Sequence, residues 1–527
     1  MLQLSNLATF DGSVCECCNH DEVSFRGGAR LRIPPFIRAS HVWFLHSFEP
    51  IRLIQWSTSR HVARPGVPTL QKAETFMSSV LQKPEIEARV VRKVARRLIP
   101  FLGLAYFVNY LDRTNIGLAK LTMSAELGLT ETMFGLASGL FFIGYLLFEV
   151  PSNLALHRFG ARRWIARIML TWGIIAAAMA FVPNVGSLYG LRMLLGIAEA
   201  GFFPGVLLYL TLWFPRAYRV RLMGLFLLAL PVSSALGAPL SSAIIQYWDG
   251  LFGLSGWRVM FLIEGIPAVL LAVVTWFYLT DRPSQATWLD EDEKVWLTRE
   301  LESEASESGP HITGSVRRAL TDSRVWMLGL VYFGITYGLY SLSFFLPSIV
   351  AGFKKTFATD FSLFTTGLIV AVPFAVGAVA MVLWSRHSDR TGERIWHVAV
   401  PTLIGAVSIP VALYMQSPLT TMIAVTVNAV GVFCALPVFW YLPSTFLTGA
   451  GAAAGIAVVN SVGNLSGFGA PYVTGWLFDA TGNSRAGLWV VGAVMLVAVM
   501  LVLVLRSRVN TTRSTEDADT RVFTASR

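Results

Sequence analysis

Two pairs of oppositely charged residues stand inside long apolar stretches of this sequence. Asp112 and Arg113 are neighbours, whereas Arg192 and Glu199 are seven residues apart. In a helix, a spacing of seven is about two turns, so Arg192 and Glu199 would share one face, roughly 10 Å apart. Asp112 and Arg113 would point about 100° apart, so one could face a cavity while the other bonds an adjacent helix.

Two interpretations of these four residues remain open. Two acids and two bases neutralise one another, so they could form an ion-pair network that braces two helices. Alternatively, the arginines hold an anionic ligand through paired hydrogen bonds while the acids titrate. Burial disfavours a charged carboxylate and a neighbouring arginine favours it, so anion arrival and proton uptake can be coupled. The second interpretation is the chemistry of a proton symporter.

The other polar residues of the apolar stretches divide unevenly between the two halves of the chain. Glu149 and Glu264 lie near predicted helix ends beside prolines, and we interpret them as packing or capping groups. The second half has no acid or arginine well inside its apolar stretches and offers amides such as Asn428, Asn460 and Asn464. We therefore expect the first half to handle charge and the second to supply neutral contacts.

The elements that position these residues are predicted to be membrane-spanning helices. Of the 527 residues, 54% are hydrophobic and 14% are charged, a composition that excludes a soluble or disordered protein. A span needs about 20 mostly apolar residues. The predicted spans are 98–118, 133–155, 164–183, 187–214, 222–247, 257–280, 325–350, 362–384, 396–415, 419–446, 452–478 and 486–505.

An internal repeat arranges these spans in two blocks of six. Residues 157–164 match residues 389–396 at four of eight positions, and Gly237-Ala238-Pro239 recurs as Gly469-Ala470-Pro471, both with an offset of 232. Because six is even, both copies enter the membrane from the same side, which gives two parallel bundles. The predicted domains are a disordered N-terminal extension over 1–80, a six-helix bundle over 81–280, a cytoplasmic linker over 281–323, a second six-helix bundle over 324–506 and a cytoplasmic tail over 507–527.

The charges of the short loops predict the orientation. Fifteen Lys and Arg residues lie just before the first span or in the short loops that follow the even-numbered spans. The loops on the opposite side contain five. Since positive loops stay in the cytoplasm, both termini are predicted to be cytoplasmic in a multi-pass protein of the cell membrane.

Motifs for enzymatic chemistry are missing from the sequence. It has no phosphate-binding Gly-Lys-Ser/Thr loop, no zinc-protease motif and no nucleophile elbow. We expect no enzyme activity, no cofactor, no metal and no nucleic-acid partner. A membrane-embedded enzyme or a membrane sensor that has lost transport stays as an alternative class.

Four motifs resemble the anion:cation symporter family of the major facilitator superfamily, especially its bacterial tartrate, phthalate and hydroxyphenylacetate permeases. The resemblance covers residues 83–506. The motifs are Tyr110-Leu111-Asp112-Arg113-Thr114-Asn115-Ile116-Gly117, Phe148-Glu149-Val150-Pro151-Ser152-Asn153, Glu199-Ala200-Gly201-Phe202-Phe203-Pro204-Gly205 after Arg192, and Arg386-His387-Ser388-Asp389-Arg390-Thr391-Gly392-Glu393-Arg394.

This resemblance implies twelve helices in two bundles around a central cavity, and it implies roles for individual residues. Asp112 and Glu199 would be proton sites, while Arg113 and Arg192 would bind substrate. Further residues implied near the substrate are Tyr110, Tyr145, Asn460 and Asn464. Residues implied in the gating loops are Arg158, Asp389, Arg390 and Arg394, although His157 stands where the superfamily usually has an Asp.

We therefore expect an all-α membrane protein that carries a small organic carboxylate together with protons, by alternating access and as a monomer in the lipid bilayer. Within the transporter class, a sugar acid, an amide substrate or export are the alternatives. Residues 1–76 are expected to be dispensable, because Met77 precedes the first span and the positive charges beside it.

Overall fold

The computed structural model describes residues 22–24, 30–32, 70–306, 321–443 and 449–525. The chain divides into two units, Met1–Glu74 and Thr75–Arg527. In the first unit, β1 (Glu22–Ser24) pairs with β2 (Arg30–Arg32) in an antiparallel arrangement. Most of the extension predicted over 1–80 lies outside the described residues. Helix α1 begins at Leu70, so the predicted boundary at residue 80 falls inside a helix.

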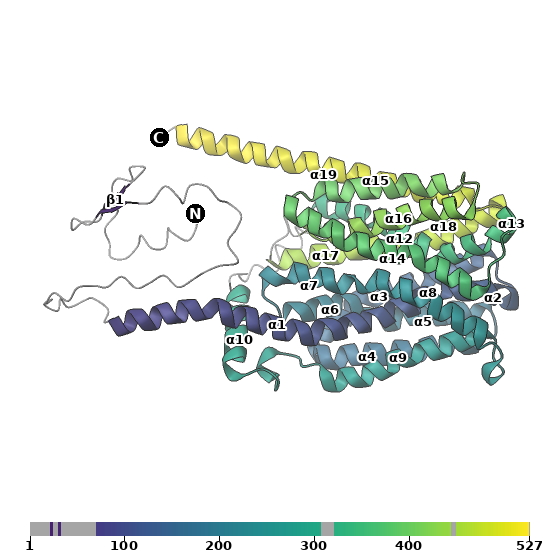
Figure 1. The fold of residues 1–527 in the computed structure, drawn as a ribbon, viewed down its shortest axis with the longest axis horizontal. Helices are drawn as coiled ribbons and strands as arrows, with labels where there is room; N and C mark the ends of the chain where they lie inside the picture. Colours follow the sequence, from purple (N-terminus) through teal and green to yellow (C-terminus); the bar gives the residue numbers. More distant parts are fainter. Residues whose placement is uncertain (1–21, 25–29, 33–69, 307–320, 444–448, 526–527) are drawn as a thin grey trace. The chain divides into compact units, whose positions relative to one another are not determined.

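The described part of the second unit is helical (Figure 1). Its first half contains α1 (Leu70–Thr114), α2 (Ile116–Leu127), α3 (Glu131–Phe159), α4 (Ala161–Ala178), α5 (Val185–Glu199), α6 (Phe202–Thr211), α7 (Arg216–Leu227), α8 (Ala229–Tyr247) and α9 (Gly256–Tyr278). The linker contains α10 (Glu291–Ser306). The second half contains α12 (Ser323–Ala351), α13 (Phe353–Phe357), α14 (Leu363–Thr391), α15 (Ile395–Ala412), α16 (Pro418–Phe439), α17 (Gly449–Asn464), α18 (Ser466–Thr481) and α19 (Arg485–Ala525).

Ten helical stretches among the described residues are long and apolar enough to cross a membrane. The other two predicted spans correspond to α1 with α2 and to α17 with α18. One residue separates the two helices of each pair, Asn115 and Leu465, and both residues keep right-handed helical backbone angles. The predicted all-α architecture is confirmed.

Local sequence explains where several helices begin. The side chains of Thr130, Ser362 and Ser417 each accept a hydrogen bond from the backbone N–H three residues further on. Asn184 and Ser187 bond each other's backbone N–H in a capping box at the start of α5. Such caps satisfy N–H groups that a helix leaves free at its first turn, so they fix the ends of the spans.

Each half packs as a bundle, and three helix pairs make the most extensive contacts between the halves. In the first half, α4 packs on α9 and α3 on α5; in the second half, α15 packs on α16 and α19. Across the seam, α3 packs on α18, α8 on α14 and α2 on α12. These three pairs set how the bundles face each other.

Helices α2 and α13 lie at one end of the bundles (Figure 1). We call it the sealed end, because the two bundles make close contacts there. A Cβ on Gly135 would clash with the carbonyl oxygen of Pro471, so no larger residue fits there. At the start of α3, the backbone N–H groups of Glu131 and Thr132 donate to the Asp479 carboxylate at 3.2 and 2.8 Å. At this end the bundles are therefore held together by close packing of α3 on the α18 backbone and by hydrogen bonds from backbone N–H groups of α3.

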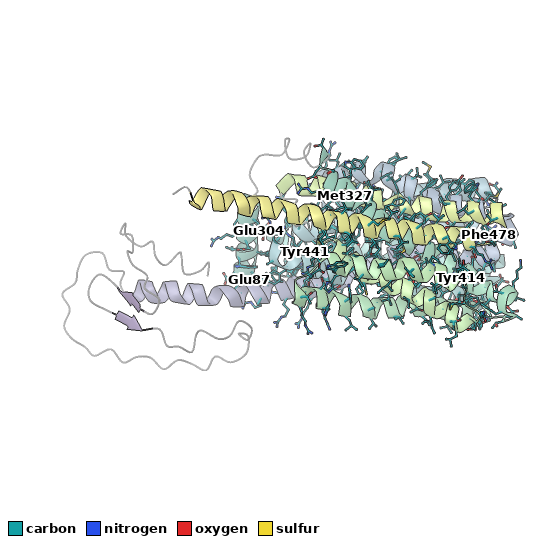
Figure 2. The ribbon with its side chains drawn as sticks, turned by 90° about the horizontal axis from the view of Figure 1, so that it is seen from above. Glu87, Glu304, Met327, Tyr414, Tyr441 and Phe478 are labelled. Carbon is teal, nitrogen blue, oxygen red and sulfur yellow. The ribbon has the colours of Figure 1, made fainter. Side chains whose placement is uncertain are left out.

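The opposite end carries the linker helix α10, and Glu87 and Glu304 lie at this end while Tyr414 and Phe478 lie at the other (Figure 2). The Glu293 carboxylate of α10 binds Lys93 of α1 at 2.6 Å, and Arg219 of α7 binds Glu304 at 2.9 Å. The part of the linker that the structure describes is thus attached to the first bundle.

Candidate functional site

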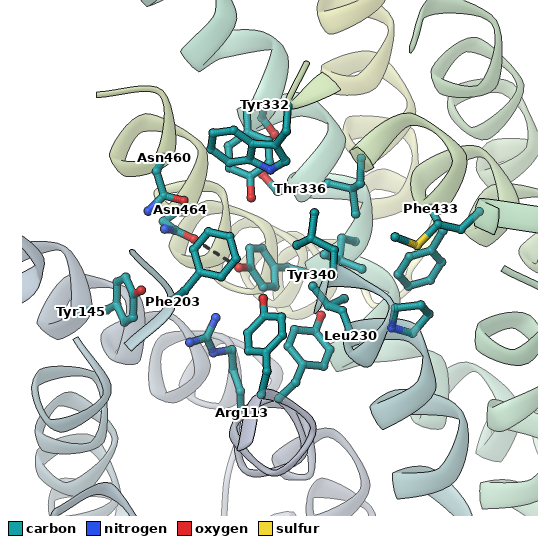
Figure 3. A pocket seen from close by; sticks show the side chains of 18 residues that line it. Arg113, Tyr145, Phe203, Leu230, Tyr332, Thr336, Tyr340, Phe433, Asn460 and Asn464 are labelled. Carbon is teal, nitrogen blue, oxygen red and sulfur yellow. Dashed lines mark hydrogen bonds between the residues drawn. The ribbon is translucent and has the colours of Figure 1, made fainter. Parts of the chain in front are cut away.

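A cavity lies between the two bundles and is lined from both (Figure 3). From α1 it receives Tyr106, Tyr110 and Arg113, whose spacing of four and three places them on one helix face. Its other lining residues are Tyr145, Phe203, Leu227, Leu230, Pro231, Tyr332, Thr336, Leu339, Tyr340, Met381, Phe433, Leu436, Trp440, Asn460 and Asn464. Of the six residues predicted to bind substrate, this cavity brings five together.

Arg113 is the charged residue of the lining. Its Nη2 lies 2.9 Å from Oε2 of Glu199, and Nδ2 of Asn109 donates to the same oxygen at 2.8 Å. The guanidinium also lies over the Tyr145 ring, 5.4 Å from its centroid. Oε1 of Glu199 is buried without a hydrogen-bond partner among the described residues. The arginine is thus both a cavity wall and the counter-ion of a buried acid.

Asp112 points away from the cavity, as the expected divergence of about 100° from Arg113 requires. Its Oδ2 accepts a hydrogen bond of 2.9 Å from the indole N–H of Trp172 on α4. Its Oδ1 is buried and has no partner within the described part of the chain. Of the two neighbours, one faces the cavity and the other bonds an adjacent helix, so this prediction is confirmed.

Arg192 stands behind the cavity wall rather than in it. Its Nε donates to the Ala137 carbonyl at 3.4 Å, and both of its terminal nitrogens are buried without a partner among residues that the structure describes. The guanidinium groups of Arg113 and Arg192 approach the same Phe141 ring, at 5.0 and 5.2 Å from its centroid. Glu199 forms its ion pair with Arg113, so helices α1 and α5 are braced as the ion-pair interpretation expects.

The buried acid of the site lies where a helix breaks. Glu199 is the last residue of α5. The break after Glu199 passes through Gly201, whose φ of 84° suits a residue without a side chain. Broken helices are where transporters expose backbone and polar groups to a cavity at membrane depth.

The second bundle contributes amides and hydroxyl groups. Asn464 accepts a hydrogen bond of 3.3 Å from the Tyr340 hydroxyl (Figure 3). Asn460 lines the cavity as well, while Asn428 donates to the Gly405 carbonyl and lies outside the lining. Sequence reasoning missed Tyr340. A signal exists, because Tyr332, Thr336 and Tyr340 recur every four residues on one face of α12.

The residues predicted for the gating loops meet only in part. Arg394 binds Asp389 at 2.8 Å, whereas Arg390 and Arg158 are exposed. In the first half, where His157 replaces the usual acid, the Asp281 carboxylate accepts a hydrogen bond of 2.8 Å from the backbone N–H of Arg162. An acid from the start of the linker therefore contacts this loop from outside it.

Within the described ranges, no group of three or more His, Cys, Asp or Glu side chains is placed to hold a metal ion. The site is therefore described by its arginine, acids, amides and aromatic rings.

The sequence of residues 102–471 matches the Major Facilitator Superfamily. The chain belongs to this superfamily, so it is a membrane-spanning, multi-pass transporter rather than an enzyme.

Among its relatives, a protein of Agrobacterium vitis named as a candidate tartrate transporter is 48% identical over 421 residues, covering 80% of this chain and 95% of the relative. The quinolone resistance transporter of Acinetobacter baumannii is 41% identical over 424 residues, covering 80% and 96%. The fold is also that of the xylose transporter XylE from E. coli in a partially occluded inward open conformation, with a TM-score of 0.63 at 15% identity, covering 78% of this chain and 97% of XylE.

Proposed function

We propose that this protein is a proton-coupled uptake transporter for a small organic carboxylate. The observation that carries the proposal is the dual position of Arg113, on the cavity wall and paired with buried Glu199. A carboxylate is the ligand class that a guanidinium binds best, through two parallel hydrogen bonds. The similarity to a candidate tartrate transporter supports the same class.

Substrate binding and proton binding are coupled in this proposal because the substrate carboxylate and Glu199 compete for Arg113. A substrate carboxylate that binds Arg113 takes over the group that neutralises Glu199. A buried carboxylate without its counter-ion costs several kcal/mol, so proton binding to Glu199 becomes favourable. Substrate and proton are then carried in the same step. Asp112, which has no cationic partner within ion-pair distance among the described residues, is the second proposed proton site.

The remaining lining supports recognition of the rest of the substrate. Asn460, Asn464 and Tyr340 offer neutral hydrogen-bonding groups opposite Arg113. Hydroxyl groups on a carboxylate such as tartrate would bind such partners.

The sealed end is proposed to face the outside of the cell. The positive loops cluster at the opposite end, where α3 ends and α14 ends, and positive loops stay in the cytoplasm. The cavity is then closed to the outside, and α10 belongs to the cytoplasmic side.

Export of an aromatic anion is a second candidate. It is favoured by the aromatic side chains of the lining, such as Tyr106, Phe203, Phe433 and Trp440, and by the relative named as a quinolone resistance transporter. Export and uptake are distinguished by the direction in which an imposed proton gradient drives the substrate across the membrane.

The test is transport by purified protein in proteoliposomes with an imposed pH gradient. Tartrate, phthalate, hydroxyphenylacetate, sugar acids and an uncharged amide form the panel. We expect at least one carboxylate to accumulate with inward proton movement and the amide not to accumulate. Accumulation of the amide alone, or carboxylate transport without proton movement, would refute the proposal.

A further inference from the structure

Two buried glutamates outside the Arg113 pair are held in the same way. Glu149 accepts hydrogen bonds from the Asn460 amide and, at 3.4 Å, from the Ser461 hydroxyl. Glu264 accepts from the Asn115 amide at 2.8 Å and from the Ser241 hydroxyl at 2.6 Å. No Lys or Arg among the described residues forms an ion pair with either one. Each is therefore a buried carboxyl group between one amide and one hydroxyl.

The two glutamates differ in where their partners come from. Asn115 immediately precedes α2 and Ser241 lies in α8. Both belong to the same bundle as Glu264. Asn460 and Ser461 belong to α17, in the opposite bundle from Glu149. The contact of Glu149 therefore spans the seam along which the bundles must separate, and the contact of Glu264 does not.

The level of the Glu149 contact along the seam follows from helix geometry. Helix α3 begins at the sealed end with Glu131 and runs away from it. Tyr145 of the cavity lining lies roughly 21 Å along the axis and Glu149 roughly 27 Å. Glu149 is thus one turn beyond the cavity on the side away from the sealed end, and its partner Asn460 is itself a lining residue.

We propose that Glu149 is a positioning residue that orients the Asn460 amide toward the substrate and fastens the bundles beside the cavity. The proposal deepens the transport function above and rests on it. One Asn460 N–H is held by Glu149, which leaves the other N–H and the carbonyl for a ligand. When the bundles part away from the sealed end, water replaces both donors and hydrates the carboxylate. Because water can replace the hydrogen bonds of this polar contact, the contact can open and close reversibly. An apolar contact at the same place would expose apolar surface to water when it opens.

Glu149→Ala and Glu149→Gln test this role, with Glu264→Ala and Glu264→Gln as matched controls. Spin labels on Arg163→Cys and Thr391→Cys, both exposed and beyond the cavity from the sealed end, report the distance between bundles in a variant without native cysteines. Uptake kinetics on the best carboxylate of the panel give KM and maximal rate separately. Thermal unfolding in detergent reports folding of every variant.

We expect Glu149→Ala to lengthen the label distance and to raise KM roughly fivefold to tenfold, the effect of about one net hydrogen bond. Glu149→Gln, which can still accept from Asn460, should restore both values to within about twofold. Glu264→Ala should lower thermal stability without changing the distance or KM.

An unchanged distance and KM in folded Glu149→Ala would overturn the proposal, as would equal shifts in folded Glu264→Ala. So would additive effects on KM of Glu149→Ala and Asn460→Ala in the double variant, because positioning requires that the two act through each other. The distance measurement needs no substrate, so it tests the fastening even if carboxylate uptake is refuted. If Glu149→Ala does not fold, Glu149→Gln becomes the deciding variant. A folded Glu149→Gln whose label distance or KM differs from the wild type by more than about twofold would overturn the proposal.

Discussion

The two bundles of this transporter hold different chemistry on either side of one cavity. The buried carboxyl, guanidinium and ammonium groups of the described spans all belong to the first bundle: Asp112, Arg113, Lys120, Glu149, Arg192, Glu199 and Glu264. The second bundle faces them with amides, hydroxyl groups and aromatic rings. Charge is concentrated in one bundle, and neutral polar groups line the cavity from the other.

This division has a mechanical consequence. The ion pair of Arg113 with Glu199 joins α1 to α5 within one bundle, so under the proposed alternating access both partners would move together. Breaking a buried ion pair costs ~3–5 kcal/mol, a barrier that would slow each cycle if the pair crossed the seam. The contact of Glu149, which crosses the seam near the cavity, has neutral donors.

The largest effect is expected from changing the cation of the first bundle. Arg113→Lys keeps the charge but loses the planar fork, so carboxylate uptake should fall roughly 100-fold, about 3 kcal/mol. Arg192→Lys should also weaken uptake, but less, because Arg192 lies behind the lining. The control is Arg258→Lys, whose ion pair with Glu126 lies outside the cavity. Wild-type uptake and affinity in both folded variants would exclude an arginine clamp.

A smaller effect is expected from the neutral bundle. Tyr340→Phe removes the hydroxyl that binds Asn464 and should raise KM about fivefold, the magnitude of one net hydrogen bond. Tyr337→Phe on the same helix is the control, since its hydroxyl bonds the Gly469 carbonyl outside the lining. Equal KM changes in the two variants would mean that Tyr340 acts on helix packing rather than on the substrate.

The sealed end should respond to loss of Asp479 by a few-fold shift. Its carboxylate accepts from the first N–H groups of α3, and a charge at a helix N-terminus contributes about 0.3–1 kcal/mol. Asp479→Asn should therefore increase opening at the sealed end about twofold to fivefold in label-distance measurements. Asp360→Asn, in an exposed ion pair with Lys354 at the same end, is the control and should leave the distance unchanged.

The pH dependence of this closure has a definite sign. Partial burial raises the pKa of Asp479, but hydrogen bonds from Thr132, Thr130 and Glu131 outweigh it and hold the pKa below the usual 3.8. A lowered pKa in the closed state stabilises closure above that value and loses the effect as pH falls through the lowered pKa. Closure by Asp479 should thus be constant from about pH 5 to 8. A change of the Asp479-dependent distance within this range would contradict the assignment.

Truncation should have the smallest effect. A protein that starts at Met77 keeps the first span and the basic residues beside it, and the unit formed by Met1–Glu74 is removed. We expect insertion and uptake within about twofold of the full chain, measured in membranes and in proteoliposomes. Loss of insertion or uptake at normal expression would assign the removed segment a role.

The divergence of Asp112 from Arg113 and the uneven distribution of charge could be predicted from the sequence. Both follow from helix geometry and from the cost of burying ions, which need no tertiary information. The particular pairing of Arg113 with Glu199 could not be predicted, since the ion-pair interpretation joined two helices without assigning a partner to each acid. Which arginine reaches an acid depends on the rotation of α1 against α5, and that rotation is set by packing.

The helix break at Gly201 was also beyond the sequence prediction. A hydropathy window averages over Gly201, although a single residue with positive φ is enough to end a helix. The sequence indicates a packing or capping role for Glu149, since it lies beside a proline near a predicted helix end. Its contact with Asn460 could not be predicted, because only the packing of α3 against the opposite bundle brings the two residues together. The helix α10 lies in a stretch whose acidic composition indicated only a linker.

Whether Glu199 carries the coupled proton is tested most directly by Glu199→Gln in proteoliposomes, with substrate accumulation under an imposed pH gradient and substrate exchange recorded in parallel. Glutamine keeps the size and can still accept from Asn109, but it cannot titrate. We expect the variant to lose uphill accumulation and to retain exchange, while Glu264→Gln accumulates substrate like the wild type. Unchanged uphill accumulation by Glu199→Gln, or wild-type accumulation that depends on sodium without proton movement, would contradict proton coupling through Glu199.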